Sequence, residues 1–340
     1  MRVDVMTSPA ALPTIQDLAR AVKGAGIDGL VVTETSRSAY LSVAAAALAA
    51  PGLDLLTGIA VAFPRSPMVT AAEAWELAEV SGGRFRLGLG TQVRAHIERR
   101  YGVAFEHPGP RLKEYVQAVR ACFRAFAGEE KLDFQGEHWS MSLLPPQWSP
   151  GKIDVPAPAI DIAAVNPWML RMAGEVADGV HVHPLNSPTY LRETVQPQVA
   201  DGARGAGRDP SEVQLIVPCF TAVGDTDEER DRWREMARMQ VSFYGSTPNY
   251  SFIFEQLGHD GVTQRLREKQ KAGDIGGMAA VIDDDLLSHF VVDSDWDGAA
   301  AAISARYLGI ADRVVLYFGA MDQGHIARWG DVAKTLSTTR

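Results

Sequence analysis

The chain has 340 residues, of which 46% are apolar and 22% charged, and its formal net charge is −9 at pH 7. This composition is typical of a globular protein with a large core, and the acidic balance argues against nucleic acid as a partner, because no basic surplus can neutralise phosphates. No apolar run is long enough to span a bilayer, and the N-terminus enters a strand without a signal peptide, so we expect a cytoplasmic protein with no membrane partner.

Short apolar runs alternate with helical patterns along the chain. The expected strands are 3–6, 29–33, 53–59, 85–89, 159–163, 179–183, 213–223 and 314–318. The expected helices include 14–25, a clean apolar stripe over 111–126, a long helix after the capping box at Thr226, and a last helix from about 323 to 336. Eight strands alternating with helices predict an α/β fold, a single (β/α)8 TIM barrel over 1–340.

The segment 53–92 reads as a strand, a helix and a second strand. Ser66-Pro67 predicts the start of the helix, and the glycines at 82 and 83 predict its end. Its expected buried face holds Val69, Ala72, Leu77 and Val80. A βαβ unit implies a parallel sheet, and parallel sheets bind ligands at the carboxyl ends of their strands. We therefore expect Gly58 and Gly90 on the side of a site.

Two stretches interrupt the alternation. Residues 128–158 are proline-rich and predict a small hairpin plus an extended loop that caps one mouth of the barrel. Residues 245–290 lack strong periodicity, and we expect short helices there that form an ordered lid or substrate wall, because long loops in compact domains are usually functional. The aromatic residues of this wall are Phe243, Tyr244, Tyr250, Phe252 and Phe254.

Three motifs in order carry a family resemblance: the pattern from Gly58 to Gly90, the helix opening at His107-Pro108, and the strand–helix–strand passage 158–180. Together they resemble the bacterial luciferase-like oxidoreductases, and most of all the branch that uses the deazaflavin coenzyme F420 instead of FMN. The resemblance covers nearly the whole chain. It implies a TIM barrel with insertions at the barrel mouth, hydride transfer between coenzyme F420 and a small organic substrate, and a homodimer.

The resemblance also implies where the cofactor lies. The implied cofactor-binding residues are Gly58, Ile59, Ala60, Gly90, Thr91, Ala164, Val165 and Asn166, the last three near the phosphate. It further implies a non-prolyl cis peptide between Gly58 and Ile59, for which a glycine relieves crowding. The structural alternatives are an ordinary trans strand end at Gly58, a tight turn at Gly90-Thr91 and a plain helix cap at Asn166.

The candidate catalytic residues are Glu34, Thr35 and His183. Glu34 and Thr35 follow the second strand, and in the resembled family the position of Thr35 often holds a histidine near the reactive ring. Glu34 is expected to orient the cofactor or a substrate hydroxyl, and the alternative is an ion pair at the barrel mouth. His183 ends the sixth strand and is expected near the cofactor or substrate.

Other polar residues near the strand ends are assigned to substrate or excluded. His181 and His183 point the same way by alternation, but the other strand ends lack the ligands of a metallohydrolase barrel, so we expect no metal. Arg94, His96 and His181 are candidate substrate contacts. Val93 stands where the similar deazaflavin-dependent sugar-phosphate dehydrogenases have a catalytic glutamate, which argues against a sugar-phosphate substrate.

Three functions remain open from the sequence. The leading hypothesis is a coenzyme F420-dependent oxidoreductase. The second is an FMN-dependent monooxygenase on the same scaffold, in which reduced flavin reacts with oxygen. The third is a non-catalytic flavin-binding barrel, because Thr35 replaces the expected histidine.

Overall fold

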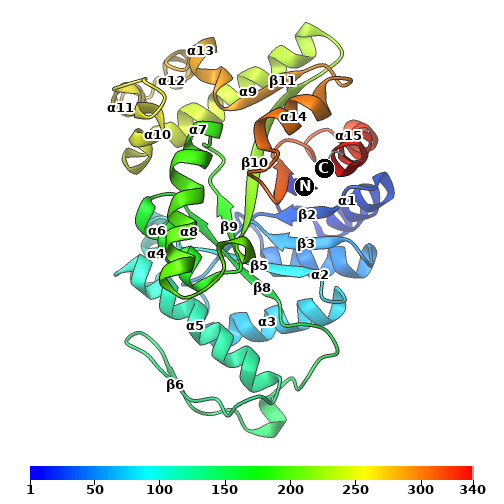
Figure 1. Cartoon of the computed structure of the whole chain (residues 1–340), viewed down its shortest axis with the longest axis vertical. Helices are drawn as coiled ribbons and strands as arrows, with labels where there is room; N and C mark the ends of the chain where they lie inside the picture. Colours follow the sequence, from blue (N-terminus) through cyan, green and yellow to red (C-terminus); the bar gives the residue numbers. More distant parts are fainter. Residues whose placement is uncertain (339–340) are drawn as a thin grey trace.

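A closed parallel barrel forms the centre of the computed structural model, which describes residues 1–338 (Figure 1). Its strands in order are β1 (Arg2–Thr7), β2 (Gly29–Val32), β3 (Asp54–Thr57), β5 (Phe85–Gly90), β8 (Ala159–Ala164), β9 (Gly179–Val182), β10 (Gln214–Val223) and β12 (Arg313–Leu316). Pairing of β12 with β1 closes the barrel. The eight expected strands and the TIM barrel are confirmed, with strand ends shifted by about two residues or fewer.

Helices surround the barrel on the outside (Figure 1). They are α1 (Leu12–Ala25), α2 (Ala39–Ala49), α3 (Pro67–Val80), α5 (Pro108–Phe126), α6 (Pro167–Val176), α8 (Gln196–Gly205), α9 (Asp227–Gly245), α14 (Ala299–Tyr307) and α15 (Ile326–Thr338). Smaller elements are β4 (Ala60–Val61), α4 (Arg94–Arg99) and α7 (Pro188–Tyr190). The predicted caps are confirmed: the Ser66 hydroxyl accepts from the Val69 amide at 3.3 Å, and the Thr226 hydroxyl from the Glu229 amide at 3.2 Å.

The buried face of α3 differs from the expected one. Val69 and Val80 are 47% and 40% exposed. The face that packs inward instead holds Thr70, Ala71, Ala74, Trp75, Leu77 and Ala78. The Thr70 hydroxyl lies 2.5 Å from the Tyr115 hydroxyl on the neighbouring helix α5. Because this hydrogen bond satisfies its hydroxyl, Thr70 can be buried on the inward face, where the apolar pattern predicted valine.

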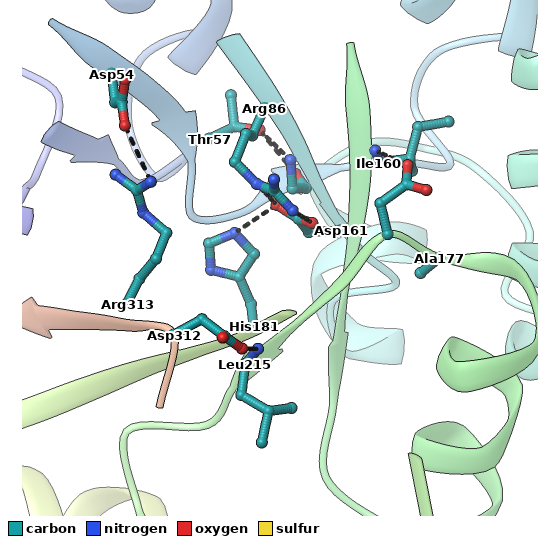
Figure 2. A network of polar contacts seen from close by, with 12 residues as sticks. Asp54, Thr57, Arg86, Ile160, Asp161, Ala177, His181, Leu215, Asp312 and Arg313 are labelled. Carbon is teal, nitrogen blue, oxygen red and sulfur yellow. Dashed lines mark hydrogen bonds and ion pairs between the residues drawn. The ribbon is translucent and has the colours of Figure 1, made fainter. Parts of the chain in front are cut away.

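Buried ion pairs fill the barrel at the amino ends of its strands (Figure 2). The Arg313 guanidinium donates to both carboxylate oxygens of Asp4, at 2.6 and 2.7 Å, and to Asp54 at 3.0 Å. Across the barrel, Arg86 donates to Asp161 at 2.5 and 2.9 Å. These bidentate contacts satisfy carboxylates that would otherwise be buried without partners, and they close this end of the barrel.

Glycines on the next strands make room for these carboxylates. A Cβ at Gly29 would lie 2.5 Å from an Asp4 oxygen, and a Cβ at Gly179 would lie 2.5 Å from an Asp161 oxygen. Above the ion pairs lies an apolar interior layer made of Met6, Val31, Leu56, Ile216 and Val315. The barrel therefore has a closed floor at the amino ends, and only its carboxyl-end mouth remains for a site.

The insertion at 128–158 forms the expected hairpin, β6 (Phe134–Gln135) with β7 (Ser140–Met141), but not over a barrel mouth. The Glu114 carboxylate on α5 accepts from the amides of Glu137, His138 and Trp139 at 2.8 to 2.9 Å. The Trp139 ring also meets Tyr115 of α5 edge to face. These contacts hold the hairpin against the outer side of α5, as Figure 1 shows, so the expected position over a mouth is wrong.

The insertion at 245–290 is ordered and helical, as expected. It contains η4 (Pro248–Tyr250), α10 (Ser251–Glu255), α11 (Val262–Lys271), α12 (Ile275–Ala280) and α13 (Asp284–Ser288). It ends in β11 (Val291–Ser294), which pairs with the end of β10. Among residues 1–338, no helix combines the length and the apolar character needed to cross a membrane.

Candidate active site

The strand ends at the open mouth bring most of the expected site residues to one side of the barrel. The cis peptide expected between Gly58 and Ile59 is present. A Cβ on Gly58 would lie 2.2 Å from a methyl carbon of Val31 on the neighbouring strand, so no larger residue fits there. A Cβ on Gly90 would lie 2.7 Å from the end of the Ile59 side chain. Gly90 thus faces Ile59 and leaves that side chain its place at the mouth.

Thr57 is a polar residue of this region that the sequence analysis missed. Its hydroxyl accepts from the Gly88 amide and donates to the Gly88 carbonyl, both at 2.8 Å. The hydroxyl therefore joins β3 to β5 directly beside the Gly58–Ile59 peptide (Figure 2). A threonine within an apolar run, one residue before a glycine, was the only signal of this role in the sequence.

Glu34 forms an ion pair with Arg65, as in the alternative interpretation of this residue as part of an ion pair at the barrel mouth. Its carboxylate is buried and accepts from the Val61 amide at 2.7 Å and from the Arg65 guanidinium at 2.6 and 3.1 Å. Arg65 also lies over the Tyr40 ring at 4.7 Å. Since Val61 follows Ile59 and Ala60, Glu34 holds the chain immediately after the cis peptide. Thr35, the next residue, is exposed, and its carbonyl accepts from Arg100.

The start of α6 presents unpaired amides at the mouth. The Asn166 side chain caps the helix by accepting from the Met169 amide at 2.9 Å. The Tyr190 hydroxyl donates to the Val165 carbonyl at 2.6 Å and fixes the turn that follows Ala164. Within residues 1–338, the amides of Val165, Asn166 and Trp168 have no hydrogen-bond acceptor. Free amides at the positive end of a helix form a place for an anion such as phosphate.

His183 belongs to an aromatic wall whose other members come from α9, the 245–290 insertion and the segment after β12. Its ring lies 4.7 Å from Tyr244 and 4.6 Å from Tyr250. The Tyr244 hydroxyl is 2.8 Å from the hydroxyl of Tyr317, which follows β12 and packs on the apolar interior layer. We name His183, Tyr244, Tyr250 and Tyr317 the mouth wall. Of the other expected aromatic residues, Phe252 contacts Tyr190, Phe254 is buried against Phe290, and Phe243 is exposed.

The mouth wall is neutral at pH 7. Burial lowers the pKa of His183 to about 3, and its Nδ1 accepts from the Leu185 amide at 3.1 Å, which leaves the proton on Nε2. Burial also raises the pKa of Tyr244 and Tyr317, so both phenols keep their protons. The wall offers hydrogen-bond donors without a permanent charge.

His181 lies deeper than His183, although both face the interior as expected. Its Nε2 has no hydrogen-bond partner in the described part of the chain and is 3.8 Å from Asp161, toward which it points in Figure 2. Burial lowers its pKa to about 4. A Cβ on Gly88 would lie 2.6 Å from this nitrogen, so His181 is enclosed by the barrel walls below the mouth.

Among the described residues, no contact joins the mouth wall to Arg94 or His96, the two candidate substrate residues on α4. Both are exposed on α4, where Arg94 pairs with Glu98 at 2.6 Å and lies over the Phe105 ring at 5.2 Å. The cysteines Cys122 and Cys219 are both free and buried in the core, and burial raises the pKa of Cys122 to about 12 and that of Cys219 to about 11. Neither thiol is available as a nucleophile at neutral pH.

A model of the luciferase-like monooxygenase family matches residues 1–313. A protein of Mycobacterium tuberculosis that bears the name "uncharacterized" is 38% identical over 315 residues, which cover 93% of both chains. The 5,10-methylenetetrahydromethanopterin reductase of Methanolobus tindarius is 28% identical over 296 residues, which cover 85% of both chains.

Solved structures share the fold. The coenzyme F420-dependent tetrahydromethanopterin reductase of Methanopyrus kandleri superposes with a TM-score of 0.77 at 21% identity, with 97% of each chain covered. The 3,6-diketocamphane monooxygenase of Pseudomonas putida, in complex with FMN, superposes with a TM-score of 0.66 at 16% identity, with 100% of this chain and 97% of that chain covered. One barrel architecture thus accompanies both a deazaflavin and a flavin.

Proposed function

Because the chain belongs to the luciferase-like monooxygenase family, we propose that it is a coenzyme F420-dependent oxidoreductase that transfers a hydride between the deazaflavin and a small organic substrate. The Methanopyrus kandleri structure supports the deazaflavin, because its protein is a coenzyme F420-dependent tetrahydromethanopterin reductase. The Methanolobus tindarius relative is also a methylenetetrahydromethanopterin reductase by name. The observation that carries the proposal is that free amides at the start of α6 and a neutral wall of hydrogen-bond donors lie at the same mouth of the barrel.

The residues present fit a cofactor that combines a phosphate with a flat ring. The unpaired amides of Val165, Asn166 and Trp168 would hold the phosphate. Ile59, after the end of the third strand, would contact the ring, and Gly90 would support it from the neighbouring strand, with Thr91 next to it. Ala60 is fully buried, so it would act only by fixing the position of Ile59. Glu34 would act indirectly, since it holds the Val61 amide rather than facing the mouth.

The chemistry asks little of the protein beyond orientation, a proton and the exclusion of water. When bound, a reduced deazaflavin supplies a hydride and an oxidised one accepts it. A hydride delivered to a carbonyl carbon requires a proton on the carbonyl oxygen, and the reverse reaction releases one. His183 Nε2–H and the paired hydroxyls of Tyr244 and Tyr317 are the protonated donors of the mouth wall that could serve this oxygen.

The aromatic side of the site also limits water. Tyr244 comes from α9 and Tyr250 from η4 of the insertion, and both rings contact His183, so α9 and the insertion together close off one side of the strand ends. A wall that excludes water strengthens each hydrogen bond inside it and protects a reactive intermediate. The insertion is therefore the part of the chain that we expect to set substrate preference.

An FMN-dependent monooxygenase is the second candidate function, because the structurally similar Pseudomonas putida protein is a monooxygenase in complex with FMN. The amides at the start of α6 would hold the phosphate of either cofactor. A non-catalytic flavin-binding barrel is the third, since exposed Thr35 stands where the resembled family often has histidine.

Titrations of both oxidised cofactors, followed by fluorescence or calorimetry, test the proposal first. We expect coenzyme F420 to bind at least about tenfold more tightly than FMN, a difference of about 1.4 kcal/mol. Turnover is then measured with each reduced cofactor on a panel of carbonyl compounds, with and without oxygen. Oxygen-dependent product with reduced FMN would replace the proposal by the monooxygenase, and tight binding without turnover would favour the non-catalytic barrel.

The mouth wall is tested by His183→Ala. We expect this variant to change the relative kcat/KM values among substrates more than the cofactor dissociation constant, because His183 lies in the mouth wall and not at the start of α6. His96→Ala is the matched control, since His96 is exposed on α4. Equal substrate profiles for His183→Ala and the wild type would remove His183 from the site.

We further propose that the chain forms a homodimer through α2. Leu41 and Leu48, seven residues apart on this helix, are 61% and 69% exposed. The rest of the helix is almost entirely apolar or small, and a helix that is apolar on all sides is normally buried. Val69 and Val80 on the adjacent α3 are exposed apolar residues as well. A second copy of this chain would cover it.

A further inference from the structure

Three metal-ligating side chains meet in the 245–290 insertion, away from the mouth wall. The ligand atoms of His259, Asp285 and His289 all lie within 4.8 Å of one another. Asp285 lies on α13 and His289 directly follows that helix, and the four-residue spacing places both on one helical face. His259 comes from the turn that follows α10, about 30 residues earlier.

The surrounding core fixes the three side chains independently of any ion. Phe254 and Phe290 are both buried, and their rings meet edge to face at 5.6 Å. Phe290 is the residue next to His289, and the Phe254 carbonyl accepts from the His259 amide at 3.0 Å. Gly258, in the left-handed conformation, lies in the turn that follows α10, directly before His259. The two halves of the cluster are therefore brought together by packing.

The distances leave room between the ligands. His259 Nε2 and the nearer Asp285 oxygen are 3.8 Å apart, too far for a hydrogen bond. Nitrogen and oxygen ligands about 2.0 to 2.2 Å from a tetrahedral zinc ion are separated by roughly 3 to 3.5 Å from one another, so a small movement suffices.

One nearby charge opposes a cation. The Arg306 guanidinium donates to the carbonyl oxygens of Ser288, His289 and Val291. Those contacts direct it toward the end of α13, whereas the exposed Asp285 carboxylate supplies the compensating negative charge on the ligand side.

We propose that His259, Asp285 and His289 bind one divalent transition metal ion, with zinc as the best match. Two imidazoles and one carboxylate suit zinc better than magnesium or calcium, which prefer all-oxygen ligands. Three protein ligands would leave a fourth position for water. The ion would tie the end of α10 to α13, and so fix the insertion that also carries Tyr250 of the mouth wall. The sequence-based expectation of no metal missed this cluster because its members lie far apart in a segment without periodicity.

The test uses the full-length chain without a histidine tag, stripped with a chelator and then titrated with zinc chloride by calorimetry and with cobalt chloride by visible absorption. We expect one ion per chain, with a tetrahedral cobalt spectrum. Asp285→Asn and His259→Ala should each weaken zinc binding by about tenfold or more. The Asp285 side chain is 81% exposed, so its replacement should not disturb folding.

The control is His325→Ala. His325 also lies beside a carboxylate, Asp322 at 3.5 Å, but no third ligand completes a cluster there among the described residues. This variant should bind zinc like the wild type. The proposal is overturned if the wild type binds no stoichiometric ion, or if Asp285→Asn and His259→Ala, verified as folded by circular dichroism, bind zinc as tightly as the wild type.

Discussion

Changing Glu34 to Gln tests how the chain after the cis peptide is held. The carboxylate accepts three hydrogen bonds, one from the Val61 amide and two from Arg65. A glutamine offers one acceptor oxygen and one NH2 group, so either Val61 or Arg65 would face a donor instead of an acceptor. Hydrogen bonds to charged groups contribute about 1.5 to 3 kcal/mol, and Arg65 is 21% exposed, so we expect a loss of about 2 kcal/mol in the free energy of unfolding.

The assay is urea denaturation of the cofactor-free protein at pH 7, with the slope of the transition checked for equality between variants. Glu73→Gln is the matched control, because the Glu73 carboxylate approaches the same guanidinium only to 3.5 Å and is more exposed than that of Glu34. We expect the control to lose less than about 1 kcal/mol. The coenzyme F420 dissociation constant should rise for Glu34→Gln alone. Unfolding energies within about 0.5 kcal/mol of the wild type, with an unchanged dissociation constant, would refute the reasoning.

Three further changes probe the interior, the β3–β5 contact and the proposed dimer. His181 is protonated below pH 6.5 in the unfolded chain but only near its lowered pKa of about 4 in the folded chain, so the free energy of unfolding falls as the pH decreases between these values. His181→Gln should reduce the dependence of this free energy on pH by about 1.4 kcal/mol per pH unit, which urea denaturation at several pH values would measure. Thr57→Val leaves the amide and carbonyl of Gly88 without partners and should cost about 2 to 3 kcal/mol in the same melts, whereas Thr57→Ser should cost less than half of that. Leu48→Asp should give a monomer in sedimentation velocity, and Leu143→Asp, at an exposed leucine of the hairpin insertion, should not; a monomeric wild type would contradict the dimer.

The barrel could be predicted from sequence because each strand is a short buried run set off by turn residues, such as 85–89 between Gly83 and Gly90. The buried face of α3 could not, because a hydropathy pattern does not contain the position of the neighbouring helix. Val69 and Val80 lie outside any covering element, while Thr70 is buried because Tyr115 offers its hydroxyl. Tertiary contacts decided a case in which apolar character gave the opposite answer.

The site was only partly predictable for a similar reason. His183 could be found, because strand alternation and its place at a carboxyl strand end need only local sequence. The partner of Glu34 could not, since Arg65 lies 31 residues away and no local pattern joins them. Tyr317 falls within the expected apolar strand 314–318, although it follows β12 in the structure, and its role depends on Tyr244 from α9. The cis peptide itself came from the family resemblance and not from the residues alone.

The floor of the barrel contains one arrangement twice. In register, Asp4 lies opposite Gly29 and Arg313 opposite Arg2, while Asp161 lies opposite Gly179 and Arg86 opposite Ala159. Each set thus places an arginine two positions below an aspartate and a glycine beside it, and the sets are four strands apart.

The two copies are completed at different times as the chain is made. Arg86 and Asp161 are 75 residues apart and can pair within the middle of the chain, whereas Arg313 reaches Asp4 across 309 residues. Until β12 docks, Asp4 lacks its counter-ion and favours contact with water over burial. A chain that stops short of Arg313 is therefore expected to remain an open sheet at its first strand and not to close into a smaller barrel.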